Sequence, residues 1–151
     1  MRRVYFIAIA VAILVFLAIS ALLARVLSAN SAEQSAITAL VRDEARGDAA
    51  AIMDAIVGCR AKPSCRRRAA EIAVAFRRSG ELSIIQIQPS TSFSVAGTLG
   101  TARVAWNVGG SLPIVQCVRV RRSGNAISGL RVDLLEISRR IESDSACPAR
   151  F

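Results

Sequence analysis

Histidine is absent from this 151-residue chain. Its absence removes the commonest general base and the commonest metal-ligating side chain of proteins. Ser83, Ser90 and Ser94 therefore lack the partner that activates a nucleophilic hydroxyl. Lysine is also scarce, because Lys62 is the only lysine among 20 basic residues. Such a bias toward arginine is typical of a GC-rich genome, so arginine content carries only part of its usual functional weight.

Motifs for phosphate, metal and redox chemistry are missing as well. Residues 97–100, GTLG, have neither the spacing nor the following helix of a phosphate-binding loop. Five residues separate Cys59 from Cys65, which fits neither C-x-x-C redox chemistry nor the short paired spacing of zinc ligands. Asp133 is the only aspartate expected in a strand, and paired carboxylates are absent. We therefore expect no enzyme activity, no catalytic residue, no cofactor and no metal.

Aromatic residues make up only 5% of the chain, which limits what its net charge of +9 can mean. Nucleic-acid binding usually combines basic residues with aromatic side chains on which bases stack. Phe93 and Trp106 are the only aromatics in the segment expected to form a sheet, and they form no such platform. We expect no nucleic-acid partner.

One long apolar run is present, at the N-terminus. Residues 4–24 carry no charge, and a helix of that length, at about 1.5 Å per residue, spans a bilayer core of about 30 Å. Arg2 and Arg3 precede the run, which by the positive-inside tendency keeps the N-terminus cytoplasmic and exports the residues after the run. A cleaved signal peptide is the alternative, with a small-x-small site at residues 29–31. The run is longer than the about 7–15 apolar residues of a signal peptide, which favours a retained anchor.

The chain thus divides into three parts. We expect residues 1–28 to form the cytoplasmic N-terminus and the transmembrane anchor, and residues 29–140 to form an extracytoplasmic domain. Residues 141–151 are expected to be a tail tied down by Cys147. The predicted localisation is the cell membrane, as a single-pass protein with its C-terminal domain outside the cytoplasm.

All four cysteines come after the anchor, and an even number of exported cysteines is typical of disulfides. Cys65 shares an apolar helix face, which favours a local bond to Cys59. Elimination then leaves Cys117–Cys147, which would clip the tail to the sheet. The alternative pairing is Cys65–Cys117 with Cys59–Cys147. On the chain-entropy relation the two favoured bonds would contribute roughly 2.4 and 3.7 kcal/mol of stability.

Three short amphipathic helices are expected before any strand. Ser31 and Gln34 fit a capping box that would begin the first of them, and Gly47 would end it. The second and third are expected to run from Asp48 to Gly58 and from Pro63 or Ser64 to Gly80. Ile37, Leu40, Val41 and Glu44 follow helical spacing in the first helix. The stripes expected to be buried in the second and third are Ile52, Met53, Ile56 and Val57, and Cys65, Ala69, Ile72, Ala73 and Phe76.

The hydrophobic period then changes from helical to alternating, which indicates strands. The expected strands are residues 82–88, 101–108, 114–122 and 126–137, with a further short one at Phe93–Ala96. A tight turn is expected at residues 123–125. Ala102, Val104 and Trp106 alternate toward the core, whereas Gln86, Gln88 and Gln116 are expected to face solvent or to line a cone.

Helices segregated from a meander sheet predict an α+β domain: a transmembrane helix, then two or three helices packed on a four-stranded antiparallel meander sheet, cone-like in shape. The segments GTARVAWNV, IVQCVRVRRSGN and GLRVDLLEI, within residues 100–137, and the Cys59/Cys65 helix junction carry a resemblance. In layout, roughly residues 31–137 resemble the nuclear transport factor two-like and cystatin-like folds. The resemblance is to small single-pass bacterial proteins that carry such a domain outside the membrane. It implies a fold and a setting, and no activity.

Five arginines are candidates for a basic contact surface: Arg66, Arg67 and Arg68 at the start of the third helix, and Arg119 and Arg121 on one strand face. A solvated surface is the simpler interpretation. The alternative is attraction to anionic lipid or to an acidic partner, since each basic residue near an anionic surface contributes about 1 kcal/mol.

An anchor, a disulfide-stapled domain and no catalytic set together predict a membrane-anchored, exported accessory or interaction domain. Its partner would be another membrane or exported protein, or anionic lipid. A pocket-type binder of a small ligand or lipid, or a degenerate cone-fold enzyme, is the alternative. A pilin-like subunit is the least favoured, because the chain has no Gly-Phe processing site and its apolar run has no glutamate.

Overall fold

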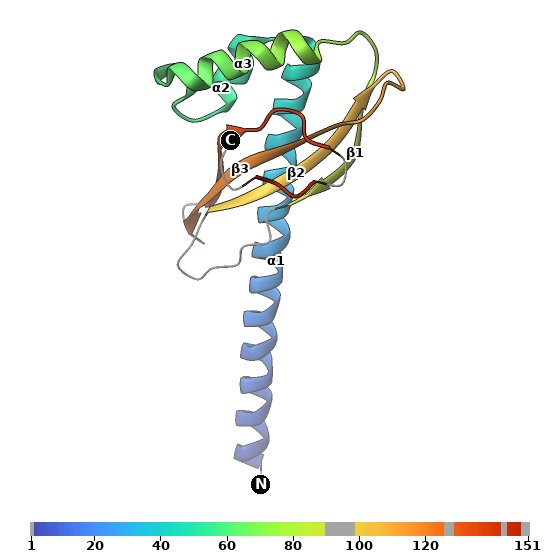
Figure 1. The fold of residues 1–151 in the computed structure, drawn as a ribbon. Helices are drawn as coiled ribbons and strands as arrows, with labels where there is room; N and C mark the ends of the chain where they lie inside the picture. The colour runs from blue at the N-terminus through green and yellow to red at the C-terminus, as the bar shows by residue number, and fades with distance from the viewer. Residues whose placement is uncertain (1, 90–98, 126–128, 143–144, 149–151) are drawn as a thin grey trace.

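The fold begins with one continuous helix, α1 (Arg2–Arg46), which is coloured from blue to teal in Figure 1. The computed structural model describes residues 2–89, 99–125, 129–142 and 145–148. Within α1 the segment Tyr5–Ala24 is long and apolar enough to cross a membrane, and it is not buried against the rest of the chain. The chain therefore has an apolar N-terminal helix that could act as a membrane anchor.

The expected helix start at Ser31 is wrong. α1 passes through Ser31 and Gln34 without a break, so these two residues form no capping box. No glycine or proline lies between residue 4 and Gly47, and therefore nothing interrupts the helical hydrogen bonds. The apolar segment and the first helix of the domain are consequently one rod of roughly 70 Å.

Three shorter helical elements follow: α2 (Ala49–Ala55), the 3-10 helix η1 (Cys59–Ala61) and α3 (Pro63–Phe76). Gly47 ends α1 with a φ of 71°, a left-handed conformation that glycine adopts without strain. Asp48 then caps α2, since its side chain accepts a hydrogen bond from the Ala51 backbone at 3.0 Å. The expected starts of the second and third helices are confirmed.

The expected apolar stripe of the second helix is wrong at its last member, Val57. Helix α2 ends at Ala55, and Ile56 takes an extended conformation that forms an isolated parallel bridge with Leu134 in the sheet. Ile56 is buried by this bridge, whereas Val57 is 46% exposed. A single residue in extended conformation therefore turns the next side chain away from the core.

Four antiparallel strands form one sheet in the order β1-β2-β3-β4: β1 (Leu82–Gln88), β2 (Leu99–Val108), β3 (Ile114–Asn125) and β4 (Gly129–Ile137). The predicted four-stranded meander is confirmed. The tight turn expected at residues 123–125 is wrong, because Ser123, Gly124 and Asn125 continue the ladder of β3 with β4. The short strand expected at 93–96 lies outside the described residues.

The core lies between one face of the sheet and the helices. Ala102, Val104 and Trp106 of β2 are buried on this inner face, as their alternation predicted. The ring of Trp106 meets Phe76 of α3 edge to face, with centroids 6.0 Å apart. The buried apolar residues that the three α-helices contribute include Ile37, Leu40, Val41, Ile52, Ala69, Ile72 and Phe76. Figure 1 shows α2 and α3 together at the end of α1 that is farthest from the N-terminus.

The chain after β4 stays beside β3 and then crosses the sheet. Ser138 donates its backbone N–H to the Cys117 carbonyl at 2.8 Å, and Ile141 donates to Val115 at 2.8 Å. Cys147 is then bonded to Cys117, with Cα atoms 5.8 Å apart. Figure 1 shows this tail in front of the sheet, on the side away from α1. The tail therefore covers part of the outer sheet face.

Candidate functional site

The five arginines expected to form one basic surface lie in two separate places. Arg66, Arg67 and Arg68 are in the first turns of α3. Arg119 and Arg121 alternate in β3 with the buried Val118 and Val120, so they project from the outer face of the sheet. The structure therefore does not bring the two groups together, because α3 packs against the opposite, inner face.

The two strand arginines are each paired with an acid on the neighbouring strand β4. Arg119 Nη1 lies 3.0 Å from Glu136 Oε2, and Arg121 Nη2 lies 2.8 Å from Asp133 Oδ2. These are cross-strand neighbours, in register as Arg119 with Glu136 and Arg121 with Asp133. The pairs neutralise the outer face locally, which makes it a poor anionic binding surface.

The start of α3 is strongly basic, although helices disfavour cations there. Lys62 is the N-cap and makes no side-chain cap, and the first turn contains no acid. The helix dipole places partial positive charge at this end, so each nearby arginine is slightly destabilising. Arg66 donates to the Arg60 carbonyl at 2.7 Å, and Arg68 donates to the Ile137 carbonyl at 3.3 Å. These bonds hold two of the guanidinium groups without neutralising their charge.

Glu71, the one acid of α3, is occupied by an arginine from a distant part of the chain. Its Oε2 accepts a hydrogen bond from Arg139 at 2.8 Å. That bond is the main reason why the pKa of Glu71 lies below its usual range, with further lowering by the charges of Arg139, Arg67 and Arg68. Helical spacing suggests Arg67 or Arg68 as the partner of Glu71, so Arg139 was missed. No local signal could have found it, since it lies 68 residues away.

We define the α3 outer face as the exposed side of this helix, formed by Arg66, Arg67, Ala70, Glu71 and Val74, together with Arg78 just beyond the end of the helix. Val74, near its middle, is 82% exposed. Arg78, just beyond the helix end, donates to the carbonyls of Ala75 and Arg77 at 3.1 and 2.8 Å. The α3 outer face thus has arginines at both ends and an apolar side chain between them.

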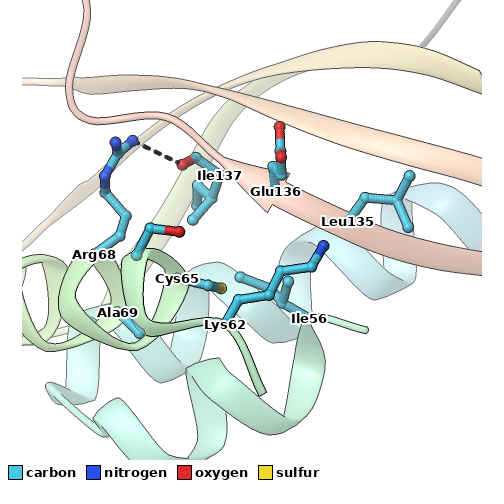
Figure 2. A pocket seen from close by; sticks show the side chains of 9 residues that line it. Ile56, Lys62, Cys65, Arg68, Ala69, Leu135, Glu136 and Ile137 are labelled. Atoms are coloured by element: carbon cyan, nitrogen blue, oxygen red, sulfur yellow. Dashed lines mark hydrogen bonds between the residues drawn. The ribbon is translucent and has the colours of Figure 1, made fainter. Parts of the chain in front are cut away.

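A small cavity lies between the start of α3 and the end of β4, and it has a volume of about 70 Å³. Figure 2 shows Lys62 and Arg68 on its helical side and Leu135, Glu136 and Ile137 on its strand side. Pockets for small organic ligands usually enclose about 300–1,000 Å³. This cavity is therefore large enough for a few water molecules or one side chain.

The Cys59–Cys65 disulfide supports this region. It joins η1 to the first turn of α3 with Cα atoms 5.2 Å apart, and Cys65 also lines the small cavity. Both disulfides therefore join the cysteines that the sequence favoured, and the inter-layer alternative is not formed. A local bond at this point fixes the direction in which α3 leaves η1.

The interior of the domain contains a buried polar group beside Trp106. Trp106 Nε1 donates to Gln116 Oε1 at 2.9 Å, and Gln116 Nε2 donates to the Ser138 carbonyl at 3.3 Å. Gln116 is fully buried, so the expectation that it faces solvent is wrong. Gln86 and Gln88, in contrast, are exposed. The register explains the difference: Gln116 pairs with Val104 on the inner face.

Glu44 of α1 is also fully buried, and neither of its carboxyl oxygens has a hydrogen-bond partner among the described residues. Burial raises the pKa of Glu44 to about 8. The nearby Gln116 amide lowers this pKa a little, although its geometry falls short of a hydrogen bond, and Asp43 raises it. At neutral pH the side chain is therefore mostly an uncharged acid. Glu44 does not line any of the described cavities.

Two broader hollows lie on the outer sheet face and open to solvent. One is lined by residues of β1 and β2 with Pro113 and Val115, and the other by β1, β2 and the tail at Ala146 and Cys147. Arg103 is the only titratable side chain that lines either of them. Acid–base chemistry needs a second titratable group nearby, which the described lining does not supply.

No three His, Cys, Asp or Glu side chains in the described part of the chain are grouped so that they could hold a metal ion. Comparison of the chain with protein-family models, with curated proteins and with solved structures finds no match. The functional argument therefore rests on the geometry of this chain alone.

Proposed function

We propose that this chain is a membrane-anchored interaction module without catalytic activity, whose exported domain binds another exported or membrane protein. The observation that carries the proposal is the continuity of α1 from the apolar segment Tyr5–Ala24 into the core of the domain. A flexible linker would let the domain tumble, whereas a continuous helix fixes its height and orientation. An interaction surface gains from such pre-organisation.

The junction between anchor and domain is held by a buried ion pair. Arg122 of β3 donates through Nε to Glu33 Oε2 at 2.8 Å, and its Nη2 donates to Asn30 Oδ1 at 3.1 Å. Glu33 is fully buried beneath this contact. These bonds attach the sheet to α1 within three helical turns of the apolar segment, which supports a rigid stalk.

The same contact supports retention of the anchor. Signal cleavage after Ser31, at the end of the small-x-small site, would cut α1 between Asn30 and Glu33, which are both bonded to the sheet. We propose that the N-terminus is cytoplasmic and the domain extracytoplasmic. The two disulfides are in keeping with an oxidising compartment outside the cytoplasm.

A filled interior supports binding by the surface rather than by a deep pocket. Trp106, Val104 and Val118 are fully buried, and helical residues pack against them. We propose that the fold is of the cone-like type, related to nuclear transport factor two-like or cystatin-like domains, with its cone closed by these side chains. A small-ligand or lipid binder, or a degenerate cone-fold enzyme, would need that interior to open.

A filament subunit is the second candidate function. One observation favours it: the first part of α1 is apolar and exposed, while its second part packs on a four-stranded antiparallel sheet with a disulfide-clipped tail. The absence of a Gly-Phe processing site and of a glutamate in the apolar run argues against it. Fractionation discriminates between the two, because a filament subunit is released by shearing cells and an interaction module stays with the membrane.

Site-specific photocross-linking in living cells tests the proposed function. A photoreactive residue is placed at exposed positions on separate surfaces, Ser35, Val74 and Ile85. An interaction module should give discrete protein adducts from one of these surfaces and none from the others. A glycine-serine linker inserted after residue 29 should weaken them, because it frees the domain from the stalk. Absence of adducts everywhere, with a small molecule retained at full occupancy in native mass spectrometry, would instead show a pocket binder.

A further inference from the structure

We propose that the α3 outer face is the docking surface, and that its partner is an acidic segment of an exported protein. This inference rests on the proposed function, since it needs the domain outside the cytoplasm and attached to α1. It names the surface and the chemistry of the partner, which the proposed function leaves open.

The arginines of α3 and those of β3 differ in their charge pairing. Arg119, Arg121 and Arg122 each form an ion pair with a carboxylate. Among the described residues, Arg66, Arg67 and Arg78 form none. Two further cations, Lys62 and Arg77, are exposed at the two ends of the same helix. Several cations without a described ion pair therefore gather around α3.

The position of these arginines relative to the helix dipole is unfavourable. Arg66 closes the first turn of α3 and Arg67 begins the second, so the partial positive charge of the helix N-terminus opposes both, Arg66 more than Arg67. They lose some stability there and gain no internal ion pair. A carboxylate from a partner at this end would interact favourably with both the guanidinium groups and the helix dipole, and so remove the conflict.

The lipid of the protein's own membrane is excluded as the partner. Arg78 donates its backbone N–H to the Ala45 carbonyl at 3.1 Å, so the end of α3 is attached to the last turn of α1. Ala45 lies roughly 30 Å along the helix from Ala24, the end of the apolar segment. Electrostatic attraction to headgroups decays over about 8 Å at physiological salt. Figure 1 shows α3 at the far end of α1 accordingly.

The spacing of the side chains indicates the shape of the acidic segment. Arg67 and Val74 are seven residues apart in α3, or roughly 10 Å along the helix and on the same side, and Arg78 follows just beyond the end of the helix at Phe76. A complementary segment would carry acids at its two ends and an apolar side chain between them. An acidic amphipathic helix has this pattern.

A peptide-binding measurement tests the inference. The probe is a fluorescein-labelled helical peptide with a glutamate-rich turn at each end and a central leucine, and its matched control has glutamine in place of every glutamate. The full chain is reconstituted in nanodiscs of neutral phosphatidylcholine, and binding is followed by fluorescence anisotropy at low and at physiological salt. We expect the acidic peptide to bind, the control peptide not to bind, and added salt to weaken binding.

Two double variants of equal net charge decide whether α3 is the surface. Arg67→Gln with Arg78→Gln should weaken binding about tenfold. Arg42→Gln with Arg140→Gln, exposed cations on other surfaces, should change it by less than about twofold. Unfolding midpoints of both variants should match that of the parent chain, which separates lost binding from lost folding. Equal weakening by the two pairs would show general charge attraction and overturn the inference, as would a lack of binding.

A second binding experiment uses anionic phosphatidylglycerol vesicles in place of the acidic peptide. If they bind the nanodisc-held chain more tightly than the acidic peptide does, and Arg67→Gln with Arg78→Gln abolishes that binding, the partner is a second membrane and the inference is wrong. Failure here is distinguishable from failure of the proposed function. Cross-links at Ser35 or Ile85 with none at Val74 would retain an interaction module and reject α3 as its surface.

Discussion

Two glutamates of α1, Glu33 and Glu44, lie on the same side of one helix and are both fully buried. Glu33 meets the guanidinium of Arg122, whereas the oxygens of Glu44 meet no hydrogen-bond partner among the described residues. The first therefore attaches the sheet to the part of α1 nearest the apolar segment. The second places an acid with a pKa of about 8 near the other end of α1. Equal burial thus has opposite consequences, because only one site supplies a counter-charge.

The largest expected effect comes from removing that counter-charge. Arg122→Met keeps much of the side-chain volume but removes the guanidinium that contacts the buried Glu33 carboxylate, which should lower the free energy of unfolding by about 3–5 kcal/mol. Urea unfolding of the full chain in detergent micelles measures the change. A loss below about 1 kcal/mol would mean that this pair behaves like a surface salt bridge.

The next effect is the pH dependence caused by Glu44. Its folded pKa lies above its unfolded value, so its contribution to stability is fully present below about pH 4.5 and is lost as the pH rises toward 8. At pH 7 the loss relative to acid is about 3 kcal/mol. Glu44→Gln should therefore be close to neutral at pH 4 and stabilising at pH 7 and above. Unfolding of both proteins across this range measures the difference, and parallel curves would contradict the buried, unpaired state.

A double variant sharpens the comparison further. Glu33→Gln with Arg122→Met removes both charges, so it should recover most of the stability that Arg122→Met alone loses, leaving about 1–2 kcal/mol. The same urea measurement applies. No recovery would show that Arg122 acts through its contact with Asn30 or through packing rather than through the Glu33 charge.

The smallest effect is expected for the paired arginine on the outer sheet face. Arg121→Met breaks the contact with Asp133, but the Arg121 side chain is 44% exposed, so water can solvate what remains. The free energy of unfolding should fall by less than about 1 kcal/mol. A loss as large as that of Arg122→Met would remove the distinction between the two faces of β3.

Periodicity alone predicted the sheet and the buried sides of α2 and α3, because these depend on local spacing. The Asp48 cap and the limits of β1 were also found correctly. The capping pattern at Ser31 and Gln34 was misleading, since a cap pattern has effect only where something stops the preceding helix. The sequence shows no such stop.

Contacts between residues far apart in the chain could not be predicted from the sequence. Gln116 was buried by the register of β3 against β2, and Glu71 was paired with Arg139 by the path of the chain after β4. The spacing of Glu44 on the stripe of Ile37, Leu40 and Val41 did signal its burial, but not its lack of a partner. For the basic residues, the sequence indicated the cluster on α3 but wrongly grouped it with the strand arginines. Only the structure shows that the strand arginines are paired with acids of β4.

The central claim is that α1 holds the domain at a fixed height, with the α3 outer face turned away from the membrane. Energy transfer from a fluorophore at Val74→Cys to acceptors in the lipid headgroups of a nanodisc measures that height directly. The account predicts a narrow distribution near 30 Å from the bilayer surface, which broadens when a glycine-serine linker is inserted after residue 29. A broad distribution in the parent chain, or a fluorophore within about 10 Å of the headgroups, would contradict it.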